Sequence, residues 1–408
     1  MNGQYCILIA KLSTHRYICI AMVERRLKRQ AVELAKKFPV LAVIGPRQAG
    51  KTTFVKSVFA DKDYVNLEEP DTRQYAQNDP RSFLAEHPSG VILDEIQRTP
   101  ELFSYIQSIV DTKKLAGQFI LTGSQHFLLH ENISQTLAGR VAILNLLPFS
   151  YEEIRGIIDE KDANALLFNG FYPPIYDRNI DPVDWYPNYV RTYVERDVRL
   201  IKNVTGLTAF STFIRMCAGR IGQLLNLSSL ANEIGVAVNT VKAWISLLEA
   251  SFVLFMLHPY HKSFNKRLVK MPKLYFYDVG LASNLLGIRN AGQISTHYSY
   301  GALFENFVIV EIMKYYFNRG IQKNTYFWRD KLGREVDCIL ERDAAVNAIE
   351  IKAGKTITPE FFKNLDYWND LPENSSTNSY IIYGGDQKQK RTNALVLPWF
   401  SVEEMFKK

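Results

Sequence analysis

The chain has 408 residues, of which 47% are hydrophobic and 22% charged, the composition of a globular protein with about three domains. No apolar run reaches the roughly 18 to 20 residues that span a bilayer, so the sequence predicts neither a transmembrane segment nor a membrane partner. The formal net charge is +7, but residues 1–38 hold eight Lys/Arg and two Asp/Glu and contribute +6 of it, so the overall charge is a weak indication of nucleic-acid binding.

The first 21 residues contain two short apolar patches that Lys11, His15 and Arg16 interrupt, without a small-residue cleavage pattern. They do not have the pattern of a signal peptide, and a cytoplasmic location is expected. The four cysteines lie far apart without any CxxC spacing: Cys6, Cys19, Cys217 and Cys338. They are predicted to be plain thiols rather than zinc ligands or disulfide partners.

A glycine-rich loop follows the first predicted strand. Residues 39–44, PVLAVI, form an apolar run of the kind buried in a parallel sheet, and the next residues, GPRQAGKTT, fit the P-loop pattern G-x-x-x-x-G-K-[ST]. In this motif backbone N–H groups approach the phosphates, Lys51 contacts the β- and γ-phosphates, and the Thr52 hydroxyl binds Mg²⁺. The predicted site for ATP and Mg²⁺ consists of Gly45, Pro46, Arg47, Gln48, Ala49, Gly50, Lys51, Thr52 and Thr53.

Two further predicted strands end in polar residues. The stretch GVILDEIQ ends in Asp94 and Glu95. Downstream of a P-loop, Asp94 is expected to complete the Mg²⁺ site, and Glu95 to orient and deprotonate the attacking water. The stretch QFILTGSQ places Ser124 at the end of the next strand, where its hydroxyl would sense the γ-phosphate or position the water; Thr122 and Gln125 are alternatives for this role.

Arg140, in LAGRVAILNLLPFS, is a candidate cation for the negative charge of the transition state. It would act either within its own chain or across a subunit boundary, and the second version requires a homo-oligomer. The alternative interpretation is a solvated or structural arginine.

Residues 151–205 are predicted to be helices around a Pro-rich loop, forming a lid or connector that responds to the bound nucleotide. Residues 206–285 have the pattern of a winged helix: a short helix, a turn at Gly235, a second helix, and two strands around a basic loop. The apolar positions of the second helix are Val241, Trp244, Ile245 and Leu248.

A DNA-binding winged helix would place Asn239, Thr240 and Lys242 in the major groove of double-stranded DNA. The candidate phosphate contacts in the basic loop are Lys262, Lys266 and Arg267. The alternative is a packing or protein-contact module, because the second helix carries few side chains that could read bases.

The C-terminal region is predicted to contain an apolar helix bearing Glu305, a strand, and a hairpin that turns at residues 342–345. Because side chains alternate along a strand, Glu350 and Lys352 share one face, and Asp337 on the partner strand can meet them. In metal-assisted phosphodiester hydrolysis Asp337 and Glu350 would bind Mg²⁺, and Lys352 would orient or activate the water. Glu305 would add an outer ligand. A solvated sheet face with a Glu–Lys ion pair is the alternative.

Together these motifs resemble a family of prokaryotic AAA+ ATPases. The resemblance rests on GPRQAGKTT, ILDEIQRTPELF, ILTGSQ and LAGR, then on YVRTYVERDV and KLYFYDVGLASNLLG, and it covers residues 22–400. It implies ATP binding, a winged-helix module, and a C-terminal region similar to PD-(D/E)xK nucleases. Because such proteins usually begin just before a helix like VERRLKRQAVELAKKF, Met22 is the expected start, and residues 1–21 are a disordered extension or a start-site artefact.

The expected fold class is α/β. It comprises a P-loop AAA+ parallel-sheet domain at residues 22–150, a helical connector at 151–205, a winged helix at 206–285 and an α/β restriction-endonuclease-like domain at 296–400. The expected function is ATP hydrolysis with Mg²⁺, coupled to action on DNA. The alternative is an ATP-dependent regulatory or protein-interaction switch whose nuclease-like domain is inactive.

Overall fold

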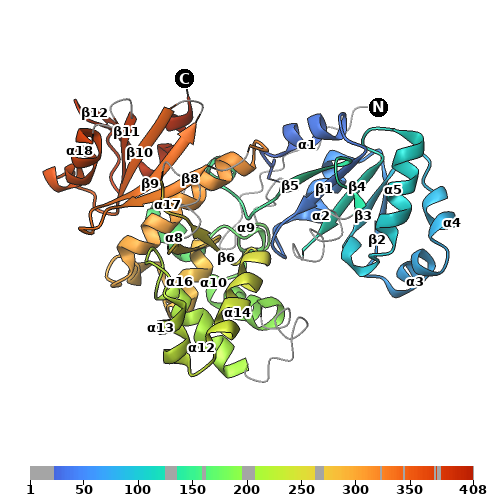
Figure 1. Cartoon of the computed structure of the whole chain (residues 1–408), viewed down its shortest axis with the longest axis horizontal. Coiled ribbons are helices and arrows are strands. Elements are labelled where there is room, and N and C mark those ends of the chain that lie inside the picture. The colour runs from blue at the N-terminus through green and yellow to red at the C-terminus, as the bar shows by residue number, and fades with distance from the viewer. Residues whose placement is uncertain are drawn as a thin grey trace, which may run out of the picture.

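The computed structural model describes residues 23–124, 136–158, 162–194, 207–261, 271–321, 324–342, 345–371, 374 and 378–407. Figure 1 shows the chain passing from a first α/β domain (blue to cyan) through a helical region (green to yellow) to a second sheet (orange to red). The predictions made for residues 1–21 and Met22 lie outside the described residues. The same holds for Gln125, Lys262, Lys266 and Arg267.

The first domain is built on a five-stranded sheet of order β2-β3-β4-β1-β5, in which all neighbouring strands are parallel. Its strands are β1 (Val40–Ile44), β2 (Asp63–Asn66), β3 (Val91–Asp94), β4 (Phe119–Gly123) and β5 (Val141–Asn145). Strands β1, β3 and β4 match three predicted apolar runs. Because the strands are parallel, the loops after β1, β3 and β4 all leave the same edge of the sheet.

Helices cover both faces of this sheet because its central strands are apolar on both sides. Leu41 and Val43 of β1 pack with α1 and α2, whereas Val40 and Ala42 pack with α5 on the opposite face. The helices of this domain are α1 (Lys28–Ala35), α2 (Lys51–Val58), α3 (Pro70–Asn78), α4 (Pro80–Ala85), η1 (Ile96–Arg98) and α5 (Leu102–Lys113). The result is a three-layer domain, and its parallel α/β sheet is the one that the sequence predicted.

The helical region carries a small two-stranded sheet, β6 (Leu254–Leu257) and β7 (Lys273–Phe276). Its helices are α7 (Tyr151–Ile154), α8 (Ala163–Asn169), α9 (Pro173–Asp177), α10 (Pro182–Tyr189), the π-helix η2 (Val190–Val194), α12 (Leu207–Ala218), α13 (Leu227–Ile234), α14 (Val238–Ala250) and α16 (Val279–Leu285). The predicted turn is confirmed: α13 ends at Gly235, whose φ of 78° is left-handed. The four predicted apolar residues of α14 are buried.

The C-terminal region contains a six-stranded mixed sheet of order β12-β13-β11-β10-β9-β8. Its strands are β8 (Thr325–Arg329), β9 (Glu335–Arg342), β10 (Ala345–Lys352), β11 (Asn378–Tyr383), β12 (Gln389–Lys390) and β13 (Leu395–Pro398). The predicted hairpin is confirmed, because β9 and β10 pair antiparallel with Arg342 opposite Ala345. The remaining elements are η3 (Ala291–Gln293), α17 (Tyr300–Phe317), η4 (Pro359–Phe361), α18 (Lys363–Asp370) and η6 (Trp399–Phe406).

Helix α17 lies against both the helical region and the C-terminal sheet (Figure 1). The Asn306 side chain exchanges two hydrogen bonds with the backbone of Phe276 on β7, at 2.7 and 2.9 Å. At the other end of the helix, the Lys314 ammonium donates to the carbonyl of Phe149, at 2.7 Å, just before α7. One helix of the predicted C-terminal domain therefore connects all three parts of the chain. The predicted domain boundaries stay predictions.

Two further features of the described residues concern membrane-spanning helices and cysteines. Within the residues that the structure describes, no helix is both long and apolar enough to cross a membrane. Of the four cysteines, Cys217 and Cys338 are described, and both are buried free thiols, as predicted for them.

Candidate functional site

The P-loop connects β1 to α2, and its two glycines are required for different reasons. A Cβ on Gly45 would lie 2.0 Å from the carbonyl oxygen of Leu146, so the loop passes too close to that backbone for any side chain. Gly50 has a left-handed φ of 86°, which costs other residues free energy. Both glycines therefore determine the shape of the loop that receives the phosphates.

Lys51 begins α2 and is buried, with its ammonium donating to the carbonyl oxygens of Gly45 (3.0 Å) and Pro46 (2.8 Å). Burial lowers the pKa of Lys51 to about 8, although Glu95 and Asp94 favour the charged form. The ammonium is held at the loop where phosphate oxygens would replace these two carbonyls.

Asp94 ends β3 and is the centre of a hydrogen-bond network. The hydroxyls of Thr52 and Tyr64 each donate to its Oδ2, at 2.7 Å, and Thr122 donates to Oδ1. Thr52 and Asp94 thus lie together as the predicted Mg²⁺ site requires, with a hydroxyl and a carboxylate oxygen as hard ligands. These two residues fit a Mg²⁺ ion that accompanies ATP.

Glu95 follows Asp94 with a left-handed φ of 56°, a conformation that non-glycine residues rarely adopt. Ser124 donates to Glu95 Oε2 at 3.2 Å, and Gln97 donates to the same oxygen. The backbone N–H of Glu95 donates to the Thr122 hydroxyl at 3.3 Å. Ser124 therefore contacts the proposed base directly, whereas Thr122 lies between Asp94 and Glu95.

A cavity of about 320 Å³ adjoins the P-loop and is lined by Arg47, Gln48, Gly50, Lys51, Thr52, Thr53, Glu68, Glu95, Pro173, Pro174, Asp177, Arg178 and Tyr193. The helical region closes one side of it: Gln48 donates to the Tyr193 hydroxyl at 3.0 Å, and the Arg47 guanidinium lies 5.4 Å from the Tyr193 ring centre. Pro173, Tyr193 and Arg178 were not predicted. Pro173 begins α9, Arg178 follows it, and Tyr193 lies in η2, and none of the three belongs to a motif that indicates nucleotide chemistry.

A second cavity of about 280 Å³ shares Gly50, Thr53, Pro173 and Asp177 with the first. Its lining combines apolar side chains such as Phe54 and Phe149 with charged ones such as Lys28. A cavity of mixed polarity next to a phosphate loop suits the base and ribose of a nucleotide. The two cavities together are of the size and polarity that ATP requires.

Arg25 was not predicted, but its side chain is hydrogen-bonded to the backbone of the P-loop. Its buried guanidinium donates to the carbonyl of Ala49 at 2.9 Å and to the carbonyl of Leu147 at 2.5 Å, and it pairs with Glu153 at 3.1 Å. Glu153 also accepts from the backbone N–H of Ser150 in a capping box of α7. Arg25 therefore joins the P-loop to the first helix of the helical region.

Arg140 lies away from this site. It directly precedes β5, whose first residue, Val141, pairs with Val40, the first residue of β1. Arg140 therefore lies at the amino ends of the strands, whereas the P-loop follows the carboxyl end of β1. Its guanidinium forms a two-point ion pair with Asp111, at 2.5 and 2.9 Å. The prediction that Arg140 acts within its own chain is wrong, because a strand length separates it from the phosphates. Action across a subunit boundary stays a prediction.

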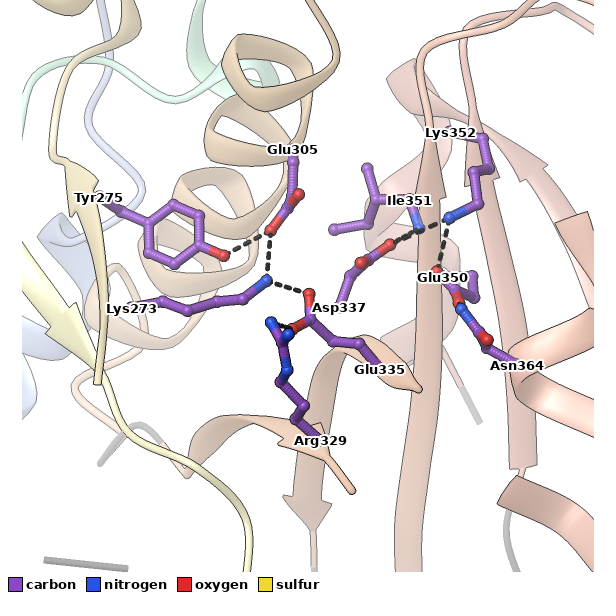
Figure 2. A network of polar contacts seen from close by, with 10 residues as sticks. All are labelled: Lys273, Tyr275, Glu305, Arg329, Glu335, Asp337, Glu350, Ile351, Lys352 and Asn364. Atoms are coloured by element: carbon purple, nitrogen blue, oxygen red, sulfur yellow. Dashed lines mark hydrogen bonds and ion pairs between the residues drawn. The ribbon is translucent and has the colours of Figure 1, made fainter. Parts of the chain in front are cut away.

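The structure brings the three predicted residues of β9 and β10 together (Figure 2). The Lys352 ammonium lies 2.8 Å from Glu350 Oε2 and 3.6 Å from Asp337 Oδ2. Asn364 donates to the other oxygen of Glu350 at 2.8 Å, and the backbone N–H of Ile351 donates to Asp337 at 2.7 Å. Burial and the charge of Asp337 raise the pKa of Glu350 well above its usual range. Burial opposes the ionised form of Asp337 too, but Lys352 and Glu350 outweigh it and lower the pKa of Asp337.

Glu305 belongs to a neighbouring cluster rather than to this pair (Figure 2). It accepts a hydrogen bond from the buried Tyr275 hydroxyl and lies 3.4 Å from the Lys273 ammonium, which also pairs with Glu335. Burial and the charge of Asp337 raise the pKa of Glu305 to about 7. Among the described residues, no group of three or more His, Cys, Asp and Glu side chains is arranged to hold a metal ion. The structure therefore does not assemble Glu305, Asp337 and Glu350 as one set of ligands.

Three of the residues predicted to contact DNA lie on α14. Asn239 and Lys242 are exposed, and Thr240 is half-buried. The buried residues of this helix include Val241 and Trp244.

Comparison with known proteins identifies three regions. Residues 37–155 match the family model described as an AAA domain, and residues 160–292 and 300–401 match two domains of unknown function (DUF8612 and DUF4143). An uncharacterized protein of Mycobacterium tuberculosis is 27% identical over 388 residues, covering 94% of this chain and 85% of the relative. One of Methanocaldococcus jannaschii is 23% identical over 419 residues, covering 89% and 84%.

Among solved structures, the Walker-type ATPase of Pyrococcus abyssi is similar at 15% identity and a TM-score of 0.39, covering 64% of this chain and 94% of that chain. The family match at residues 37–155 coincides with the parallel sheet, the P-loop and the Asp94–Glu95 pair. The first α/β domain is therefore similar to an AAA domain and has a P-loop, and it is followed by a helical region and a mixed-sheet region that are similar to domains of unknown function.

Proposed function

We propose that the protein hydrolyses ATP with Mg²⁺ and uses the nucleotide state of its P-loop to control a DNA-binding helical region and a nuclease-like C-terminal sheet. The observation that carries the ATPase part is the convergence of Lys51, Thr52, Asp94 and Glu95 at one sheet edge. A cytoplasmic location and assembly into a homo-oligomer through Arg140 belong to the same proposal.

Each residue at this edge has its own role in ATP hydrolysis. Lys51 leaves the Gly45 and Pro46 carbonyls and neutralises the β- and γ-phosphates, and the Mg²⁺ that Thr52 and Asp94 would hold supplies further positive charge. Glu95 accepts the proton of the attacking water, and Ser124 holds the Glu95 carboxylate in position. Because Gln48 contacts Tyr193, a change at the P-loop reaches η2 directly.

Action on DNA is supported by the order of elements between residues 207 and 276. Helix α12, a segment that bridges to β7 at Ile221 and Leu224, helices α13 and α14, and the β6–β7 pair follow one another as in a winged helix. The exposed Lys242 on α14 has no acidic partner within the described residues, which leaves its charge available for a phosphate.

The test uses supercoiled plasmid with Mg²⁺ or Mn²⁺ and ATP. Wild-type protein is expected to nick the plasmid, and Asp337→Ala and Lys352→Ala are expected to abolish nicking while ATP turnover persists. Equal nicking by wild type and both variants would assign the activity to a contaminant and remove the nuclease part of the proposal.

A second candidate function is an ATP-dependent switch with an inactive nuclease-like sheet. It is favoured by one observation, that Lys352 and Lys273 already neutralise Glu350 and Glu305. For such a switch, plasmid stays intact with every metal, and duplex DNA leaves the rate of ATP turnover unchanged. Stimulation of ATP turnover by DNA would instead favour the first function.

A further inference from the structure

A cavity of about 200 Å³ lies between η2, α12 and α16, away from the P-loop and from Asp337. Three arginines line it, one from each of the three segments: Arg191 on η2, Arg215 on α12, and Arg289, which follows α16. Among the residues that the structure describes, no aspartate or glutamate lines this cavity. The remaining described lining residues are the polar Ser211 and Asn284 and the apolar Pro187, Val190, Ile214 and Leu285.

The pairing of these arginines differs from that of others in the chain. Arg140 pairs with Asp111, Arg220 with Glu233, and Arg155 with Glu403. By contrast, none of the three guanidinium groups at the cavity has a hydrogen-bond or ion-pair partner within the part of the chain that the structure describes. All three arginines are exposed, so their guanidinium groups are accessible to an anion from solution.

The side chain of Asn284 is a second, independent indication that this cavity binds a ligand. Its side-chain nitrogen is buried and has no hydrogen-bond partner among the described residues. An unpaired buried amide opposes folding, so such groups are usually completed by a ligand or water. The cavity is also much larger than the roughly 10 to 15 Å³ that one water needs by the same measure.

We propose that this cavity binds a phosphate group, with Arg191, Arg215 and Arg289 as charged donors and Asn284 as a neutral donor. The guanidinium fork matches the oxygens of a phosphate in two-point hydrogen bonds. The chemistry is shared by a nucleic-acid backbone phosphate and by free phosphate, and the experiment below distinguishes these two sources.

The site is connected to the ATPase site through η2. Arg191 lies two residues before Tyr193, which accepts a hydrogen bond from Gln48 of the P-loop and lines the ATP cavity. Single π-helical turns within helices frequently occur at functional sites. Phosphate bound at Arg191 therefore acts on the same short element that contacts the nucleotide loop.

The experiment uses the full chain with its P-loop saturated by Mg²⁺ and a non-hydrolysable ATP analogue, so that only other phosphate sites are measured. Inorganic phosphate binding is followed by ³¹P line broadening, and binding of a fluorescent 20-base-pair duplex by anisotropy over a range of salt concentrations. The variants are Arg215→Gln and Arg289→Gln. The control is Lys113→Gln, which removes an exposed charge on α5 in the first domain.

Each arginine variant is expected to weaken phosphate binding at least fivefold, with the control unchanged. A parallel loss of duplex affinity, with a salt slope reduced by about one, assigns the phosphate to a nucleic-acid backbone. Unchanged duplex affinity assigns it to free phosphate. The proposal is overturned if both arginine variants bind phosphate and duplex as the control does, even if Lys242→Gln on α14 weakens duplex binding.

Discussion

Glu95, the proposed base, has a strained backbone. Its left-handed φ of 56° turns the chain sharply after β3, and its carboxylate accepts a hydrogen bond from Ser124, which directly follows the neighbouring strand β4. Residues in such conformations persist where the surrounding contacts hold them, and they are common at active sites. The contacts from Ser124, Gln97 and Thr122 are the ones that hold Glu95 here.

We expect Glu95→Gln to bind ATP like the wild type but to hydrolyse it about 10²- to 10⁴-fold more slowly, because an amide cannot accept the proton of water. Phosphate release and equilibrium nucleotide binding measure the two effects separately. The matched control is Glu69→Gln, an exposed carboxylate before α3. Unchanged turnover in Glu95→Gln would show that another group is the base.

The lowered pKa of Lys51 predicts that ATP binding depends on pH. Since burial lowers its pKa to about 8, the free protein loses the ammonium charge as the pH rises above that value. Bound phosphates favour the charged form, so ATP affinity is expected to fall above pH 8, by at most about tenfold per pH unit. Calorimetric titration between pH 7 and 9.5 measures it.

The control for this pH dependence is Lys51→Arg, whose guanidinium stays charged throughout the range. Its ATP affinity should be weaker but constant with pH. A wild-type affinity that does not change between pH 7.5 and 9.5 contradicts the assignment of the dependence to Lys51.

At the scale of elements, Arg25 joins the segment before α1 to the P-loop and to α7. Arg25 donates to Ala49 within the P-loop and to Leu147 after β5, and it pairs with Glu153 on α7. Both side chains of the ion pair are buried, with 7% and 0% of their surface exposed. Removing one partner of such a pair leaves the other charge buried without compensation.

Arg25→Ala is expected to lower the free energy of unfolding by about 3 to 5 kcal/mol and to weaken ATP binding through the displaced Ala49 carbonyl. The adjacent Arg26→Ala is the control: its side chain is 52% exposed and pairs with Glu152 at 3.3 Å, so a loss below about 1 kcal/mol is expected. Urea denaturation and ATP titration of both variants make the comparison. Equal losses would mean that burial of the Arg25 pair does not matter.

At the scale of the whole molecule, Lys273 connects the helical region to the C-terminal sheet. It extends from β7, is 2% exposed, and contacts Glu305 on α17 and Glu335 on β9 (Figure 2). Burial disfavours its charge, but Glu305, Glu335 and nearby Asp337 outweigh burial and raise the pKa of Lys273. The ammonium therefore neutralises carboxylates that would otherwise repel each other across the boundary between the two regions.

Lys273→Met is expected to cost about 3 to 5 kcal/mol at pH 8 and less at pH 5.5. The pKa of Glu305 is already raised to about 7, above its unfolded value, so its ionisation opposes folding, and stability falls as the pH rises toward 7. Without Lys273 this penalty grows. The control Arg329→Met removes the more exposed partner of Glu335 and should cost less than about 1 kcal/mol at either pH.

Urea denaturation at the two pH values measures both variants. A Lys273→Met loss that is independent of pH would show that lost packing of the aliphatic chain, rather than unpaired carboxylates, dominates the effect.

Features that depend on residues close together in the chain were predicted correctly, whereas features that depend on distant residues were not. The P-loop, β3 with Asp94 and Glu95, and the β9–β10 hairpin with Asp337 and Glu350 were located correctly, because each rests on a local motif or on strand alternation. Arg140 was misplaced within the chain because a motif does not tell which end of a strand faces the phosphates. Tyr64 and Arg25 were missed, because isolated tyrosines and arginines carry no pattern of their own. Tyr193 lies in the stretch YVRTYVERDV, but the resemblance gave it no role.

By itself, the sequence determined the nucleotide chemistry, because the nine residues GPRQAGKTT bind phosphate mainly through their own backbone conformation. It also determined which residues of β9 and β10 share a face. Only the tertiary structure decided that Lys273 lies against Glu305 and Glu335, which are 32 and 62 residues away in the chain, and that Arg191, Arg215 and Arg289 line one cavity. Burial, pKa and ion pairing depend on which distant segments pack together, and no local pattern encodes that.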